Sequence, residues 1–141
     1  MRVRAVTPCN ISSDFRLEEL FFSTTNPKGT ITSGNSVFVR VSRFTAEELI
    51  GEPHNAIRHP DMPRAVFRLL WQTIAEGRPI AAYVKNMAKD GTYYWVVALV
   101  VPVKDGYLSI RFKPSSPLLG EVEKLYARMR AVEKEHGAGP E

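Results

Sequence analysis

Two Asp-Gly pairs divide the second half of the chain into three extended segments, and they constrain the fold more than any other feature of the sequence. Asp90-Gly91 separates residues 79–87 from 93–103, and Asp105-Gly106 separates 93–103 from 108–113. Asp-Gly favours tight hairpin turns because both residues tolerate a positive φ angle. Strands joined by a tight hairpin pair antiparallel. The sequence therefore predicts three consecutive strands of one antiparallel sheet.

Two further strands are predicted nearer the N-terminus. Aromatic and β-branched residues cluster in 20–25, and 30–32 is a second short segment of the same kind. The turn signal Asn26-Pro-Lys-Gly29 lies between them, since Pro fixes φ and Gly supplies a positive φ. Residues 1–17 are expected to form an arm or a short leading helix.

The segment after the second strand changes to helical spacing. Asn35 precedes apolar residues at helical intervals, and its side chain is suited to cap the first backbone N–H groups of a helix. A second short helix is predicted after Thr45, because Thr45 and Glu48 have the spacing of a capping box and Gly51 can end the helix.

Residues 52–63 are rich in proline and polar residues. A long regular helix is excluded there because Pro60 and Pro63 each lack a backbone donor. Pro63 suits the first turn of a following helix, whose apolar residues recur on one face as far as Ile74 and which ends at Gly77. Helices grouped between two blocks of strands predict an α+β domain with the helices on one face of an antiparallel sheet.

The C-terminal segment is predicted to be helical from Pro117 onward. Its apolar residues are spaced 4, 3, 4 and 3, which is the seam of a coiled coil over about two heptads; they are Leu118, Val122, Leu125, Met129 and Val132. An amphipathic helix folded against its own domain fits the same spacing. We expect an arm at 1–17, the α+β domain at 18–114 and this helix at 115–141.

Composition excludes several classes of protein. The 141 residues suit one domain, and 44% hydrophobic with 24% charged residues is an ordinary globular balance. The net charge of +4 is spread among interleaved acids and bases, so nucleic-acid binding is not expected. The longest apolar run, 95–103, is shorter than the roughly 20 residues of a membrane helix. A single cysteine, Cys9, is typical of a reducing cytoplasm.

The order of elements and several motifs resemble the PAS domain of bacterial aerotaxis receptors. The densest match is Arg58-His-Pro-Asp-Met-Pro63, and other matching motifs are Pro53-His-Asn55, Val84-Lys-Asn86, Tyr94-Trp-Val96 and Ser109-Ile-Arg111. The resemblance implies a PAS fold, with a five-stranded antiparallel sheet, short helices on one face and a C-terminal helix. It also implies FAD as cofactor, redox or oxygen sensing, and a chemotaxis or other signalling domain as partner. The expected setting is cytoplasmic, as a separate protein or as part of a membrane-anchored receptor, with no direct membrane insertion.

Flavin binding makes three demands that this sequence can meet. An apolar slot for the flat ring can come from aromatic and aliphatic side chains, a polar partner for its pyrimidine edge from an amide, and a cation for the diphosphate from a guanidinium. The candidates are Phe67, Trp71, Ile80 and Tyr94 for the slot, Asn35 and Asn86 for the edge, and Arg58 and His59 for the diphosphate, with Asp61 in the same loop.

Each candidate also has a purely structural interpretation. Phe67 and Trp71 lie on an apolar helix face and could be core residues, Asn35 could act only as a helix cap, and Asn86 could be a surface amide. The group Arg58, His59 and Asp61 could form a polar staple in which Asp61 caps the helix after Pro63.

Two other functions remain open from the sequence. Ile80 stands where the family usually has a tryptophan near the flavin, which favours a ligand-free or small-metabolite module that dimerises through its sheet face or terminal helices. Haem is an alternative cofactor, with His54 or His59 as axial ligand. No zinc-type spacing or nucleophile–base signature occurs, so neither a metal site nor an enzyme is expected. A flavin–cysteine adduct is excluded because Cys9 lies far upstream of the central helices.

Overall fold

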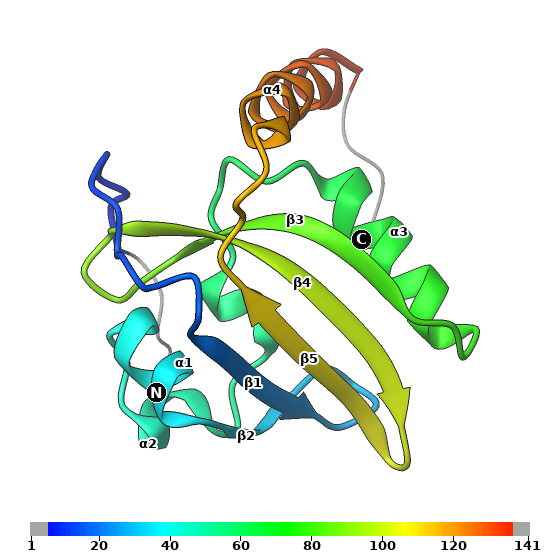
Figure 1. The fold of residues 1–141 in the computed structure, drawn as a ribbon. Coiled ribbons are helices and arrows are strands. Elements are labelled where there is room, and N and C mark those ends of the chain that lie inside the picture. The colour runs from blue at the N-terminus through cyan, green and yellow to red at the C-terminus, as the bar shows by residue number, and fades with distance from the viewer. Residues whose placement is uncertain (1–5, 137–141) are drawn as a thin grey trace.

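The protein is built on one five-stranded antiparallel sheet. The computed structural model describes residues 6–136. In strand order the sheet is β2-β1-β5-β4-β3, and Figure 1 shows it as a twisted layer that runs through the middle of the molecule. The strands are β1 (Leu20–Thr25), β2 (Ile31–Gly34), β3 (Ile80–Met87), β4 (Tyr93–Val103) and β5 (Gly106–Phe112).

Both Asp-Gly hairpins form as predicted. β3 pairs with β4 and β4 with β5, each antiparallel, and Asp105 and Gly91 have φ angles of 66° and 90°. β5 then pairs antiparallel with β1 in the centre of the sheet. β1 has the predicted bounds, whereas β2 and β5 each begin and end within two residues of the predicted segments.

The three predicted helices between β2 and β3 also form, as α1 (Ser36–Ser42), α2 (Ala46–Leu49) and α3 (Arg64–Ala75). The proline-rich segment 52–63 holds in addition one 3-10 turn that was not predicted, η1 (His54–Ile57). Asn35 caps α1 by accepting from the Phe38 N–H. Thr45 and Glu48 form the predicted capping box of α2. These helices cover one face of the sheet, as expected (Figure 1).

The N-terminal arm is extended over its described part and forms no helix between residues 6 and 19. Ser12 bridges Tyr93 in parallel at the start of β4. Phe15 is buried, and its ring meets the Phe21 ring edge-on, with centroids 5.2 Å apart. The arm therefore contributes to the core. Residues 1–5 and 137–141 lie outside the described range.

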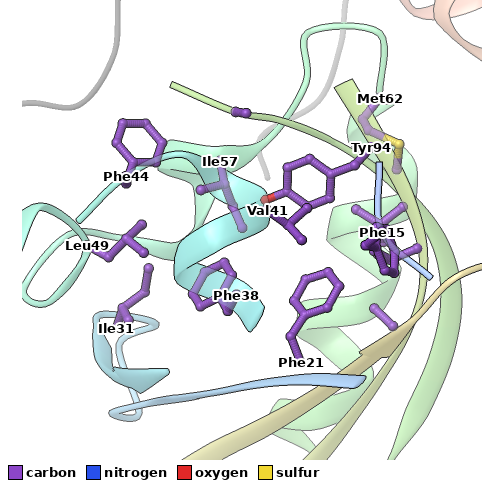
Figure 2. Packing of buried hydrophobic residues seen from close by; sticks show 14 of the residues in the cluster. Phe15, Phe21, Ile31, Phe38, Val41, Phe44, Leu49, Ile57, Met62 and Tyr94 are labelled. Atoms are coloured by element: carbon purple, nitrogen blue, oxygen red, sulfur yellow. The ribbon is translucent and has the colours of Figure 1, made fainter. Parts of the chain in front are cut away.

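The core fills the space between α1, α2, η1 and the sheet. Figure 2 shows Phe21 and Phe38 facing each other, with Tyr94 and Val41 beside them. The Phe21 and Phe38 rings stack with centroids 6.0 Å apart. Burying several aromatic side chains in one cluster supplies the main stabilisation of a domain of this size.

The C-terminal helix α4 (Leu118–His136) lies against the β3 edge of the sheet (Figure 1). Val122 and Met129 pack against the core, and the Tyr126 hydroxyl donates to the Tyr83 carbonyl at 2.7 Å. The helix is thus folded against its own domain, which is one of the two predicted arrangements. The remaining residues of the predicted seam, Leu118, Leu125 and Val132, are exposed.

Among residues 6–136, no helix has both the length and the apolar character needed to cross a membrane.

Candidate functional site

A cavity of about 450 Å³ lies between α3, η1 and the inner face of the sheet. Its walls come from the β1–β2 turn, η1, α3 and the inward-facing residues of β3, β4 and β5. Short side chains on the strands leave this room, because Ala98, Val100 and Ser109 all face it. Elsewhere on the same face, the larger Phe21 and Tyr94 fill the core.

Aromatic side chains line one end of the cavity. Trp71 from α3 meets Tyr107 from β5 edge-on, with centroids 5.9 Å apart, and Phe67 lies one turn earlier on α3. Gly29 in the β1–β2 turn makes room for the indole, since a Cβ atom there would lie 2.6 Å from Trp71 Cη2. The turn and the helix are therefore fitted to each other around Trp71.

Arg58 and Asn86 enter the cavity side by side. Their backbones form an isolated antiparallel bridge, which fastens the loop after η1 to β3. The Arg58 guanidinium lies over the Phe67 ring, with Cζ 4.4 Å from its centroid. Asn86 is 3% exposed, and its side chain faces the cavity with an amide that can both donate and accept.

Arg111 on β5 is a fully buried polar residue of the cavity lining. It is 1% exposed, and its Cζ lies 4.2 Å from the Phe38 centroid and 5.0 Å from the Phe21 centroid. Its Nη2 donates to Ser23 Oγ at 2.5 Å, and its Nη1 donates to His54 Nε2 at 3.2 Å.

Burial sets the protonation states of Arg111, His54 and Tyr94. It lowers the pKa of Arg111 to about 10, so the guanidinium still carries its charge at neutral pH. Burial, followed by the Arg111 charge, lowers the pKa of His54 to about 3, so that its imidazole is neutral. Burial also raises the pKa of Tyr94, which keeps its hydroxyl protonated.

Four of the nine candidate residues named from the sequence line the cavity. Arg58, Phe67, Trp71 and Asn86 come together there. Another four, Asn35, His59, Asp61 and Tyr94, are absent from its lining. Ile80, proposed for the same slot, packs instead against the cluster of Leu70, Ile74 and Val100.

Asn35 holds structure together at the start of α1. Its Oδ1 accepts from the N–H groups of Phe22 and Phe38, and its Nδ2 donates to the Leu20 carbonyl. Tyr94 is a core residue, 1% exposed, whose hydroxyl has no hydrogen-bond partner among the described residues.

His59 and Asp61 form a polar cluster with each other outside the cavity lining. His59 Nδ1 accepts from the Asp61 N–H at 3.0 Å, and the Asp61 carboxylate accepts from Lys85 Nζ at 3.0 Å. Burial and then the Lys85 charge lower the pKa of His59 to about 4. Burial alone would raise the pKa of Asp61, but its contacts with Lys85 and His59 outweigh this and hold the pKa low.

The suggestion that Asp61 caps the helix after Pro63 is wrong. The N-terminus of α3 is capped from another element, because the Glu133 carboxylate of α4 accepts from the N–H groups of Arg64 and Ala65 at 3.0 and 2.9 Å. Asp61 is held away from that position by Lys85. A local sequence motif could not have indicated a cap supplied from so far along the chain.

Sequence reasoning about the site missed Arg111, Ser109 and Tyr107. Alternation along the last strand was the available signal, since Tyr107, Ser109 and Arg111 are spaced two apart and share a face. The sequence pointed to His54 only as a haem ligand and not as a partner of Arg111. Among residues 6–136, no group of three or more His, Cys, Asp or Glu side chains could hold a metal ion.

Comparisons with known proteins agree on the fold. A family model described as the PAS fold matches residues 31–109. The aerotaxis receptor of Escherichia coli (strain K12) is 44% identical over 114 residues, which cover 77% of this chain and 22% of the receptor. The chain therefore spans about a fifth of that relative's length.

Two solved structures have a similar fold. The blue-light activated histidine kinase of Erythrobacter litoralis EL346 superimposes with a TM-score of 0.64 at 11% identity, covering 79% of this chain and 40% of the kinase chain. The light-state structure of the blue-light photoreceptor Aureochrome1 LOV gives a TM-score of 0.61 at 21% identity, covering 78% of this chain and 90% of the other. With the family model matching more than half of its length, the chain belongs to the PAS family.

Proposed function

We propose that this chain is a cytoplasmic sensory PAS domain that binds FAD in the cavity and reports the redox state of the flavin to a signalling partner. The observation that carries the proposal is the cavity itself, with aromatic side chains at one end and an amide and two guanidinium groups on its walls. The similarity to an aerotaxis receptor supports the sensory part.

The residues present fit a flavin. A volume of about 450 Å³ lies within the range of roughly 300–1,000 Å³ that small-molecule pockets occupy. Phe67, Trp71 and Tyr107 offer apolar surface to the isoalloxazine ring, and Asn86 offers an amide to its polar edge. Arg58 and the exposed Lys28 supply cations for the diphosphate. When bound, the flavin supplies reversible electron transfer.

The route to a partner runs through α4. Arg130 on α4 donates to the Asp61 carbonyl, and Glu133 caps α3, the helix that carries Phe67 and Trp71. The loop that begins at Arg58 and the first turn of α3 are therefore both fastened to α4. A shift of either on ligand reduction changes the contacts of α4, which is a local event with a distant readout.

A visible absorption spectrum tests the proposal. Purified protein is expected to be yellow, with flavin bands that bleach on addition of dithionite, and apoprotein is expected to recover them with FAD. Trp71→Ala and Arg58→Ala are each expected to weaken FAD binding at least tenfold. Trp71→Ala removes an aromatic side chain from the cavity wall, and Arg58→Ala removes a cation from it. The control Arg128→Ala removes an exposed arginine of α4 and is expected to leave affinity unchanged. A folded, colourless protein that rejects FAD would refute the proposal.

Haem binding is less compatible with the structure, because a ring nitrogen of His54 and a ring nitrogen of His59 are each already engaged in a hydrogen bond. His54 Nε2 already accepts from Arg111 and lies 3.2 Å from Ser23 Oγ. His59 Nδ1 accepts from the Asp61 N–H, and His59 is absent from the cavity lining. A Soret band after haem reconstitution, abolished by His54→Ala or His59→Ala, would favour haem over FAD.

We also propose that two copies associate through the outer face of the sheet. Leu20 and Phe112 pair across β1 and β5 on that face, both are exposed, and Phe22 lies beside them. Adjacent exposed apolar residues of this kind mark interaction surfaces. Light scattering is expected to give the mass of a dimer, and Phe22→Lys is expected to give a monomer. A monomeric parent protein would refute this proposal without affecting FAD binding.

A further inference from the structure

Arg111 is a buried cation for which the described part of the chain supplies no counter-charge. Its guanidinium is enclosed by the Phe21 and Phe38 rings and by the imidazole of His54. Among the described residues it forms no ion pair, because its two hydrogen-bond partners are the neutral groups Ser23 Oγ and His54 Nε2. Its Nε atom is buried and has no acceptor within residues 6–136.

Such an arrangement is unfavourable on its own. Removing a cation from water is unfavourable unless an anion or a full set of acceptors replaces the solvent. The two aromatic rings recover only part of the lost hydration, because a cation–π contact is weaker than a full set of charged hydrogen bonds. Residues 6–136 therefore enclose a charge that none of them balances.

The charge lies where a ligand can reach it. Arg111 belongs to the lining of the cavity, together with Asn86 and Ser109 on neighbouring inward positions of the sheet. His54 cannot balance it, because an imidazole whose Nε2 accepts from Arg111 carries its proton on Nδ1 and is neutral. An anionic group on a ligand bound in the cavity would supply the missing counter-charge.

We propose that Arg111 is the counter-ion for a negative charge on the ligand in this cavity, and that it favours the reduced, anionic form of a bound flavin ring over the neutral oxidised form. This proposal rests on the proposed function for the identity of the ligand. In the step concerned, the neutral ring takes two electrons from an external reduced electron carrier and one proton from water, and becomes a monoanion. The carrier is oxidised, no covalent bond to the protein forms or breaks, and Arg111 keeps its protons.

A redox titration of Arg111→Met separates this role from a structural one. Methionine keeps most of the apolar bulk but removes the charge, so the oxidised flavin is bound about as before and the reduced anion loses its partner. We expect the ratio of reduced to oxidised affinity to fall at least tenfold, which corresponds to a midpoint potential lower by about 30 mV for a two-electron couple. The ligand-free variant is expected to unfold at the same or a higher temperature than the parent, because an unbalanced buried charge has been removed.

Two further variants serve as controls. Arg128→Met removes an exposed arginine of α4 and is expected to leave the potential unchanged. Arg111→Lys keeps a cation at the same position and is expected to retain most of the potential of the parent. A potential that stays the same in Arg111→Met, or that falls as far in Arg111→Lys as in Arg111→Met, overturns the proposal while FAD binding itself stands.

A second measurement does not depend on flavin. 2-Naphthoate and 2-naphthamide have the same aromatic frame and differ in charge, so their affinities for the ligand-free protein report on Arg111 directly. We expect the parent and Arg111→Lys to bind the carboxylate at least tenfold more tightly than the amide, and Arg111→Met to lose that preference. Equal affinities in the parent protein overturn the proposal. A protein that rejects FAD but prefers the carboxylate supports Arg111 as a counter-ion and refutes the flavin.

Discussion

Gly29 provides a test of how the β1–β2 turn shapes the cavity. Its φ angle is +86°, and a Cβ atom would lie 2.6 Å from Trp71 Cη2 and 2.9 Å from Cζ2. Gly29→Ala therefore combines the left-handed strain of a non-glycine residue, about 1–2 kcal/mol, with overpacking, about 1–3 kcal/mol. Together they predict a loss of roughly 2–5 kcal/mol in the free energy of unfolding. The Trp71 indole, which is only partly buried, is expected to be displaced.

Gly77 supplies the matched control. Its φ angle is +82°, close to that of Gly29, but a Cβ atom there would meet nothing within 4 Å. Gly77→Ala is therefore expected to show only the strain, about 1–2 kcal/mol. The difference between the two variants isolates the contact with Trp71.

Urea denaturation and tryptophan fluorescence measure both effects. In a Trp95→Phe background Trp71 is the remaining tryptophan, so its emission maximum is expected to shift in Gly29→Ala and not in Gly77→Ala. In a Trp71→Ala background the overpacking is absent, and Gly29→Ala is expected to destabilise no more than Gly77→Ala. If Gly29→Ala still destabilises the Trp71→Ala protein more than Gly77→Ala does, the contact between residue 29 and the Trp71 indole is not the cause of the difference. FAD affinity is expected to fall in Gly29→Ala, because the same indole lines the cavity.

Three more predictions concern the elements around the site. Glu133→Gln removes the charge from the α3 cap and is expected to increase proteolysis within α4, whereas Glu135→Gln on the exposed face is not. Thr45→Ala breaks the capping box of α2 and is expected to lower the free energy of unfolding by about 1 kcal/mol in urea. Stability is expected to fall as pH is lowered from 6.5 to 5, because His54 and His59, with pKa values of about 3 and 4 when folded, take up protons mainly in the unfolded chain. His54→Gln is expected to make that urea profile flatter, and an unchanged slope would contradict the assignment.

Local signals in the sequence were enough to predict the strands, the two Asp-Gly hairpins and the helices α1, α2 and α3. Asp-Gly pairs fix two hairpins by a preference of the residues themselves, and the caps at Asn35 and Thr45 involve groups within three residues of each other. Such interactions form wherever the segment is placed, so they can be predicted without knowledge of the rest of the fold.

Interactions between distant segments could not be predicted in this way. The cap of α3 comes from Glu133, which lies 69 residues beyond Arg64. The apolar residues of the C-terminal segment are spaced 4, 3, 4 and 3. A helix with this spacing can pack equally well against a partner helix or against its own domain. Tyr126, which the heptad pattern leaves out, is the buried residue of α4 and its anchor to β3.

The candidate site combines both cases. Phe67 and Trp71 could be predicted because they lie on the apolar face of α3, and the same face lines the cavity. Arg58 could be predicted because it belongs to the motif Arg58-His-Pro-Asp-Met-Pro63. Arg111 lies in a strand whose inward positions read as core, where a charged residue is almost never buried without a partner. The departure from that rule becomes visible only when Ser23, His54 and Phe38, from three other elements, are seen to surround the guanidinium without balancing it. A buried charge that the fold leaves unbalanced is best explained by what enters the cavity, and for that reason Arg111 is the residue whose replacement most directly tests what the site binds.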